Sequence, residues 1–121
     1  MKYVDGFVLA VKKRMLKDYI KMANVAAKIW KDHGALEYFE TVGDDLTSKW
    51  AGIKFNQMVK AKPNETVVFS FIVYKSKSHR DKVNDKVMND PRMNDPKYKD
   101  KPMPFDMKRM AYGGFNVIVE K

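Results

Sequence analysis

Thr66-Val-Val-Phe-Ser-Phe-Ile-Val-Tyr74 is the stretch that decides how the rest of this chain folds. Nearly all of its residues are β-branched or aromatic, and it holds no glycine or proline, which is typical of a buried strand. Because side chains alternate along a strand, one face carries Val67, Phe69, Phe71 and Val73 and the other carries Val68, Ser70, Ile72 and Tyr74. Both faces are largely apolar, whereas a strand at the surface would have one polar face. We therefore predict a central strand whose sheet has helices on one side and a different cover on the other.

The composition is that of a folded protein with one hydrophobic core. The 121 residues, 45% of them hydrophobic, suffice for a single domain over residues 1–121. No apolar run approaches the ~20 residues of a membrane span. The N-terminal residues include Asp5 and Gly6 where a signal peptide would be apolar. Cysteine is absent, which excludes disulfides and zinc–sulfur sites. We expect a cytoplasmic protein without a membrane partner.

The remaining elements follow from periodicity and from helix-terminal residues. The expected order is a strand at Tyr3–Val11, a helix at Met15–His33 stopped by Gly34, an edge strand at Leu36–Val42, a short helix near Lys54–Lys60, the central strand, a helix from the N-cap Ser78 to Asn89, and a strand at Met110–Glu120. The short helix is expected to bury Phe55, Met58 and Val59 together. Gly6 marks either a β-bulge, which we favour, or a close approach of another group.

This order of elements predicts an α+β fold, the ferredoxin-like βαββαβ sandwich with an antiparallel sheet. Such a sheet carries both helices on one face and leaves the other bare. The bare face is apolar here, so a second copy of the chain is its simplest cover. Two sheets closing on each other would give a homodimer with the form of a dimeric α/β barrel and an internal cavity.

Several segments resemble one known family, the YbaA-like small bacterial proteins of unknown function. They are Tyr3-Val-Asp-Gly-Phe-Val8, Gly43-Asp-Asp45, Glu65-Thr-Val-Val-Phe-Ser70, Arg80-Asp-Lys82, Asp90-Pro-Arg92, Met103-Pro-Phe-Asp106, Lys108-Arg-Met110 and Gly113-Gly-Phe115. The resemblance implies the ferredoxin-like fold and the dimeric-barrel grouping. It implies no reaction and no catalytic residue.

No catalytic or metal-binding motif is recognisable. The chain has two histidines, no nucleophile–histidine–acid order and no glycine-rich phosphate loop. Asp44 and Asp45 are adjacent, but aspartate is common in turns and no third ligand lies close in sequence. We therefore expect no cofactor and no metal, and the pattern leaves open whether the protein is an enzyme.

A small-molecule ligand in the barrel cavity is the leading functional hypothesis. Apolar ligand sites need only a few inward polar groups. The polar strand residues that could serve are Asp5, Glu40, Ser70, Tyr74, Tyr112 and Asn116. The alternative for each is a structural hydrogen bond or a place at a strand end. In the proline-rich loop Pro91–Pro104, Met103 could, together with Phe105 just beyond the loop, cover a cavity mouth, or the loop could dock a protein partner.

The net charge of +9 raises nucleic acid as a less favoured partner. The charge is spread evenly, with +5 in residues 1–62 and +4 in residues 63–121. A basic band could form from Lys75, Lys77, Arg80, Lys82 and Lys86, extended by Lys97, Lys99 and Lys101. Acidic residues such as Asp81 and Asp85 interrupt it, so a solvated surface is the better interpretation.

Overall fold

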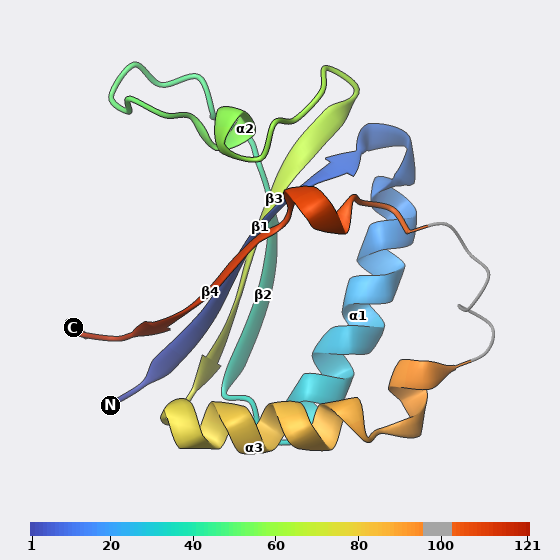
Figure 1. Cartoon of the computed structure of the whole chain (residues 1–121), viewed down its shortest axis with the longest axis vertical. Coiled ribbons are helices and arrows are strands. Elements are labelled where there is room, and N and C mark those ends of the chain that lie inside the picture. Colours follow the sequence, from blue (N-terminus) through green and yellow to red (C-terminus); the bar gives the residue numbers. More distant parts are fainter. Residues whose placement is uncertain (96–102) are drawn as a thin grey trace.

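The computed structural model describes residues 1–95 and 103–121 (Figure 1). Its helices and strands are β1 (Tyr3–Lys12), α1 (Leu16–Asp32), β2 (Glu37–Val42), α2 (Phe55–Met58), β3 (Glu65–Tyr74), α3 (Lys77–Met88) and β4 (Ala111–Asn116). Short 3₁₀ turns occur at η1 (Lys13–Met15), η2 (Pro91–Asn94) and η4 (Met107–Arg109). The predicted order of strands and helices is confirmed, and α1 lies within one residue of its expected bounds.

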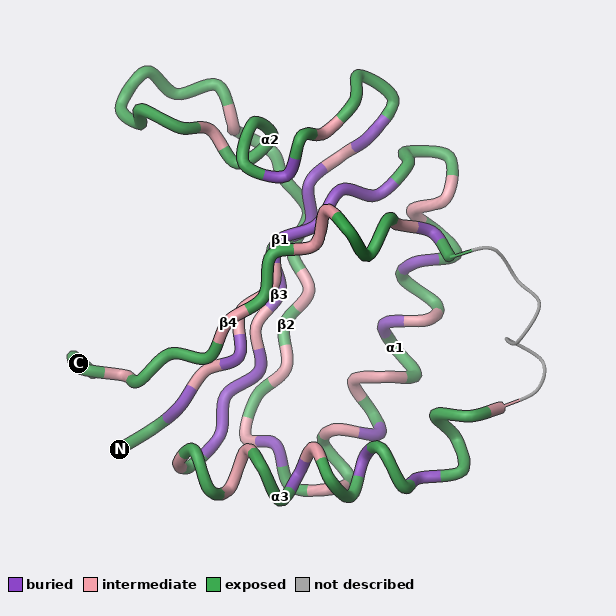
Figure 2. The backbone as a smooth tube through the Cα atoms, viewed as in Figure 1, coloured by how far each residue is buried: buried purple, intermediate pink, exposed green. Residues whose placement is uncertain are grey.

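The strands form one four-stranded sheet in the order β2-β3-β1-β4. All neighbouring pairs are antiparallel, and β1 pairs with β3 along its whole length, from Tyr3 opposite Tyr74 to Lys12 opposite Glu65. The stretch Thr66–Tyr74 is therefore an inner strand, and β2 is an edge strand, as predicted. Buried residues concentrate on β1 and β3, whereas β4 is mostly exposed (Figure 2).

Helix α1 covers one face of the sheet, and α3 lies across one end of it (Figure 1). Leu9, Val11 and Val68 of the sheet pack against Tyr19 and Ala23 of α1. Helix α3 contributes only Val83 and Val87, which join a second cluster with Ile29 and Tyr74. The thin apolar stripe expected for this helix is confirmed. Because α3 does not lie along the sheet, part of the helix-facing side is left for other segments to cover.

The opposite side of the sheet is only partly covered. The segment 43–64, which contains α2, lies on this side (Figure 1). Its Val59 packs with Val8, Ala10 and Val67. Beyond that contact the sheet presents what we call the open face: Val4, Gly6, Phe39, Phe69, Phe71 and Phe115. Phe39 is 46%, Phe69 41% and Phe115 61% exposed, so a large aromatic surface meets solvent.

The structure corrects two expectations about helices. The N-cap of α3 is Ser76 and not Ser78, because Ser76 has an extended backbone and its hydroxyl accepts a hydrogen bond from the His79 amide at 3.1 Å. Ser78 lies inside the first turn. In the short helix, only Val59 is buried, whereas Phe55 and Met58 are each nearly half exposed. A single helical turn can press only one side against the sheet.

Two further expectations about strands are wrong. Gly6 is not a bulge, because it pairs with Phe71 on β3 and with Gly113 on β4 in unbroken register. A Cβ on Gly6 would lie 3.4 Å from the Phe115 ring, so the glycine leaves room for that ring. Strand β4 ends at Asn116, four residues earlier than expected, because its partner β1 begins at the residue opposite, Tyr3.

Within the two described ranges, no helix has the length and apolar character needed to cross a membrane.

Candidate functional site

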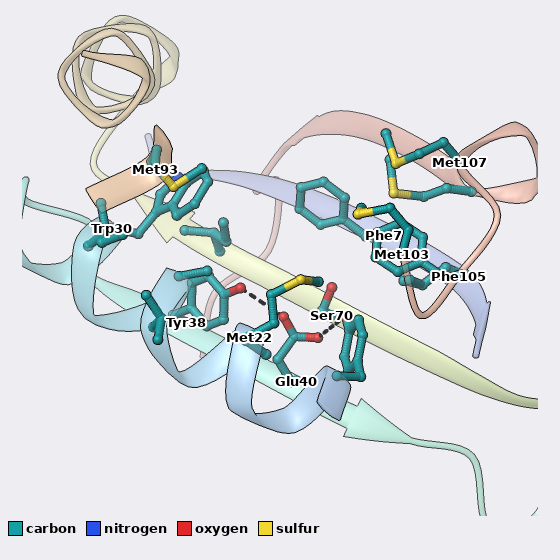
Figure 3. A pocket seen from close by; sticks show the side chains of 18 of the residues that line it. Phe7, Met22, Trp30, Tyr38, Glu40, Ser70, Met93, Met103, Phe105 and Met107 are labelled. Carbon is teal, nitrogen blue, oxygen red and sulfur yellow. Dashed lines mark hydrogen bonds between the residues drawn. The ribbon is translucent and has the colours of Figure 1, made fainter. Parts of the chain in front are cut away.

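A cavity of about 480 Å³ lies between α1 and the helix-facing side of the sheet (Figure 3). It exists because α3 lies across the end of the sheet and does not fill the space beside α1. Side chains from the segments after α3 cover this space, among them Met93 on η2, Met103, Phe105 and Met107 on η4. Phe105 is held in place by a backbone bridge to Val11 and by an edge-on contact with the Tyr19 ring at 5.9 Å.

The walls of the cavity are almost entirely apolar. Met22, Ala26 and Trp30 line it from α1. They are spaced four residues apart, so they form one stripe along the helix. Phe7 and Ile72 line it from the two inner strands. Methionine side chains are flexible and polarisable, so a cavity rich in them adapts to ligands of different shapes.

Glu40 is the carboxylate of this cavity, and two tyrosines hold it (Figure 3). The Tyr19 hydroxyl on α1 donates to Oε1 at 2.7 Å, and the Tyr38 hydroxyl donates to Oε2 at 2.8 Å. Burial, reinforced by the neighbouring Glu40, raises the pKa of both phenols well above the ordinary value. Both phenols therefore stay neutral and act as donors, and Glu40 is the acceptor of both hydrogen bonds.

Ser70 lies directly opposite Glu40 in the pairing of β2 with β3, and it also lines the cavity. Its side chain makes no hydrogen bond to another described residue. Among the described residues no fully buried polar side-chain atom lacks a partner, so the Ser70 hydroxyl must be open to the cavity. Glu40 and Ser70 thus provide a charged and a neutral polar group on the same wall.

Two other predicted residues meet in a separate cluster outside the cavity lining. Asp5 is 2% exposed, and Arg80 donates to its Oδ1 at 2.7 Å. The Tyr112 hydroxyl donates to the same oxygen at 3.1 Å and accepts from Arg80 at 2.9 Å. The guanidinium also lies 4.9 Å from the centre of the Tyr3 ring. These groups satisfy one another, as a buried ion pair requires.

The last two predicted residues lie apart from both groups. Tyr74 is fully buried, and its hydroxyl donates to Asn84 Oδ1 at 3.2 Å, which also accepts from the Trp30 indole at 3.1 Å. Burial raises the pKa of this phenol, so it stays a neutral donor. Asn116 is exposed at the end of β4. Ligand binding by any of the six predicted residues stays a prediction.

All six residues lie on the helix-facing side of the sheet, so none of them faces the open face. The cavity described above lies on this same side, within one chain, and the predicted cavity between two open faces stays a prediction. Sequence reasoning missed Tyr19, Tyr38, Trp30 and the methionines other than Met103 as lining residues. Two features of the sequence could have identified them. One is the row of apolar residues along α1, and the other is the two-residue spacing of Tyr38 and Glu40, which places both on one face of the strand.

Met103 and Phe105 were expected to cover a cavity mouth, and they do line this cavity. Residues 96–102 of the proline-rich loop, including Lys97, Lys99 and Lys101, lie outside the described residues. Among the residues that the structure describes, no three histidine or carboxylate side chains gather so as to hold a metal ion.

Comparisons with solved structures support the fold. A dimeric ferredoxin-like protein from an uncultured marine organism matches 100% of both chains with a TM-score of 0.56 and 14% identity. Protein Atu4242 from Agrobacterium tumefaciens matches 94% of this chain and 91% of its own, with a TM-score of 0.55 and 18% identity. At these identities the likeness shows the fold alone, and it agrees with the predicted ferredoxin-like architecture.

Comparisons of sequence show the family. The chain is 47% identical to "Uncharacterized protein YbaA" of Escherichia coli strain K12, over 121 residues and 100% of both chains. The protein of the same name from Shigella flexneri matches to the same extent. Residues 2–107 match the family model described as "Protein of unknown function (DUF1428)". The resemblance noted from the sequence is thus confirmed, and the chain belongs to the DUF1428 family of proteins of unknown function.

Proposed function

We propose that this protein binds a small apolar molecule carrying one polar group in the cavity between α1 and the sheet. The observation that supports this proposal is an apolar cavity into which Glu40 and Ser70 project. Its volume of about 480 Å³ is within the usual range for small-molecule sites, in which apolar walls provide affinity and a few polar groups provide orientation. Binding, and no particular reaction, is the function proposed.

We also propose that the protein acts in the cytoplasm as a homodimer of single-domain protomers. The open face supports dimerisation, because aromatic surfaces of this kind commonly mark interfaces. The marine neighbour described as dimeric has the same fold. Packing of two open faces would form a dimeric α/β barrel. The ligand cavity of each protomer would then lie on the other side of the sheet, outside the barrel.

Nucleic-acid binding is less well supported. Arg80 is engaged by Asp5 and Asp81, and Arg92 is engaged by Asp32 and Asp90. Guanidinium groups that are already paired with carboxylates have little remaining attraction for phosphate.

Titration with the apolar fluorescent probe N-phenyl-naphthylamine tests the proposed binding. We expect saturable binding of one probe per protomer. Ala26→Trp places an indole in the cavity and should weaken the binding, whereas Lys21→Trp on the exposed side of α1 should not. Phe39→Glu alters only the open face and should leave the binding unchanged. Binding that survives Ala26→Trp and disappears with Phe39→Glu would place the probe on the open face and overturn the proposal.

A further inference from the structure

We infer that the cavity selects cationic ligands, namely molecules with an apolar body and a protonated amine that meets Glu40. This inference rests on the proposed small-molecule binding and adds the chemical class of the ligand. The reason is a charge imbalance. Glu40 brings a carboxylate to an apolar cavity, and the groups that contact it there are neutral.

The first step concerns the partners of Glu40. Its two hydrogen bonds come from the Tyr19 and Tyr38 hydroxyls. No lysine, arginine or histidine of the described residues forms an ion pair with it. A carboxylate offers about four acceptor positions, so roughly two remain for a ligand N–H. The adjacent Ser70 hydroxyl adds a further acceptor on the same wall.

The second step concerns Arg92, a cation that also lines the cavity. Its Nε and one terminal nitrogen donate to Asp90 at 3.1 and 2.7 Å, and the other terminal nitrogen donates to Asp32 at 2.8 Å. Hydrogen bonds from Arg92 hold the pKa of both carboxyl groups below the ordinary value, so both stay ionised. Two carboxylates thus compensate the positive charge of this guanidinium. Arg92 therefore neither neutralises Glu40 nor attracts an anionic ligand.

The third step concerns the surroundings. Trp30 and Tyr38 form one aromatic wall, with ring centres 6.2 Å apart, and aromatic faces attract cations. Apolar walls lower the local dielectric, so a nearby carboxylate strongly favours a cation and disfavours an anion. The net charge of +9 acts in the opposite direction. Salt screens exposed charges beyond about 8 Å, however, so Glu40, which lies within contact distance of the ligand, determines which ligand charge is favoured.

Three probes of one shape test this inference by isothermal titration calorimetry at neutral pH: phenylbutylamine, phenylbutanol and phenylbutyrate. A charge-assisted hydrogen bond to Glu40 should make the amine bind between about tenfold and about a hundredfold tighter than the alcohol. The carboxylate probe should bind more weakly than the alcohol. Glu40→Gln should abolish the advantage of the amine, so that the ratio of the amine and alcohol affinities falls to about one. Glu37→Gln, on the exposed side of the same strand, is the matched control.

The outcomes separate this inference from the proposed function. If the alcohol binds and the amine binds no more tightly, the charge selectivity is wrong while small-molecule binding stands. If a folded Glu40→Gln variant still prefers the amine, the group that recognises the ammonium lies elsewhere, and the assignment to Glu40 is overturned. If none of the three probes binds, the proposed function itself fails. Comparison of the probes on the wild-type protein requires no variant, so it remains decisive if Glu40→Gln does not fold.

Discussion

Tyr38 and Glu40 lie two residues apart on β2, so both side chains face α1. Tyr19 reaches the same carboxylate from α1. Glu40 therefore joins the edge strand to α1 through the Tyr19 phenol, and Tyr38 on its own strand makes the second hydrogen bond. This double arrangement holds the carboxylate in one orientation, which a ligand-recognition group requires.

We expect Tyr38→Phe to lower the free energy of unfolding by about 1 kcal/mol, because Glu40 loses one hydrogen bond in a partly buried position. Urea denaturation at neutral pH measures this change. Tyr3→Phe is the control, since the Tyr3 hydroxyl has no hydrogen-bond partner among the described residues and the ring contact with Arg80 is retained. Equal effects of the two substitutions would mean that the Glu40 hydrogen bond contributes nothing to stability.

A second carboxylate, Glu65, contributes stability that depends on pH. Arg109 on η4 donates to both oxygens of Glu65 at 2.7 Å, and the Glu65 side chain is 3% exposed. These hydrogen bonds, helped by the Lys62 amide, lower the pKa of Glu65 from 4.5 to about 2. Because the pKa in the folded state is the lower one, the stabilisation is present above pH 4.5 and is lost as the pH falls toward 2.

Glu65→Gln should therefore lower the free energy of unfolding by about 2 kcal/mol at neutral pH. The difference from the wild type should shrink steadily between pH 4.5 and pH 2. Urea denaturation at several pH values measures both effects. Glu120→Gln removes a carboxylate from the exposed pair with Lys2 and should change stability little at any pH. A pH-independent difference for Glu65→Gln would contradict the assignment.

At the scale of elements, local patterns predicted the strands well because alternation reports which faces are buried. Thr66–Tyr74 has two apolar faces, and it is an inner strand. The N-cap of α3 was misplaced because Ser76 and Ser78 both have capping side chains, and the end of β3 at Tyr74 decides between them. The position of α3 across the end of the sheet was not predictable. Val83 and Val87 show which side of the helix is buried, but they do not show where on the sheet the helix lies.

The candidate site was predictable only in part for the same reason. Glu40 and Ser70 could be identified as polar residues on largely apolar strands. The cavity that they both line depends on where α3 and η2 lie. These positions are fixed by contacts between residues that are far apart in sequence. Asp90 is the main contact, because it accepts from His33 on one side at 2.7 Å and from Arg92 on the other.

Asp90→Asn should therefore loosen η2 without unfolding α1 or α3. We expect amide hydrogen exchange in residues 92–95 to become roughly tenfold faster, because the hydrogen bonds that Asp90 accepts from the Arg92 amide and guanidinium are weakened. Hydrogen exchange read by mass spectrometry measures this directly. Asp85→Asn makes the same change in charge on the exposed side of α3 and is the control. Unchanged exchange in residues 92–95 would show that Asp90 does not anchor η2.

At the scale of the whole molecule, the two sides of the sheet differ in structure and in proposed function. The helix-facing side holds the cavity and the buried polar clusters. The open face is aromatic, and Gly6 and Gly113 allow the Phe115 ring to lie close to the sheet. The exposed aromatic residues of the open face, Phe39, Phe69 and Phe115, do not line the cavity, so ligand binding and self-association are separable by substitution.

Replacing Phe39 and Phe115 together by glutamate should convert the proposed dimer into a monomer. Both rings lie on the open face and are about half exposed in one chain, so the dimer would bury four of them and the substitutions would introduce four charges. Loss of that apolar burial should raise the dimer dissociation constant roughly a thousandfold or more. Native mass spectrometry at micromolar concentration distinguishes the two states. Ile20→Glu also replaces a half-exposed apolar residue by glutamate, but on the solvent side of α1, and should leave the dimer intact. A wild-type monomer, or a dimer that persists in the double variant, would show that the open face is not the interface.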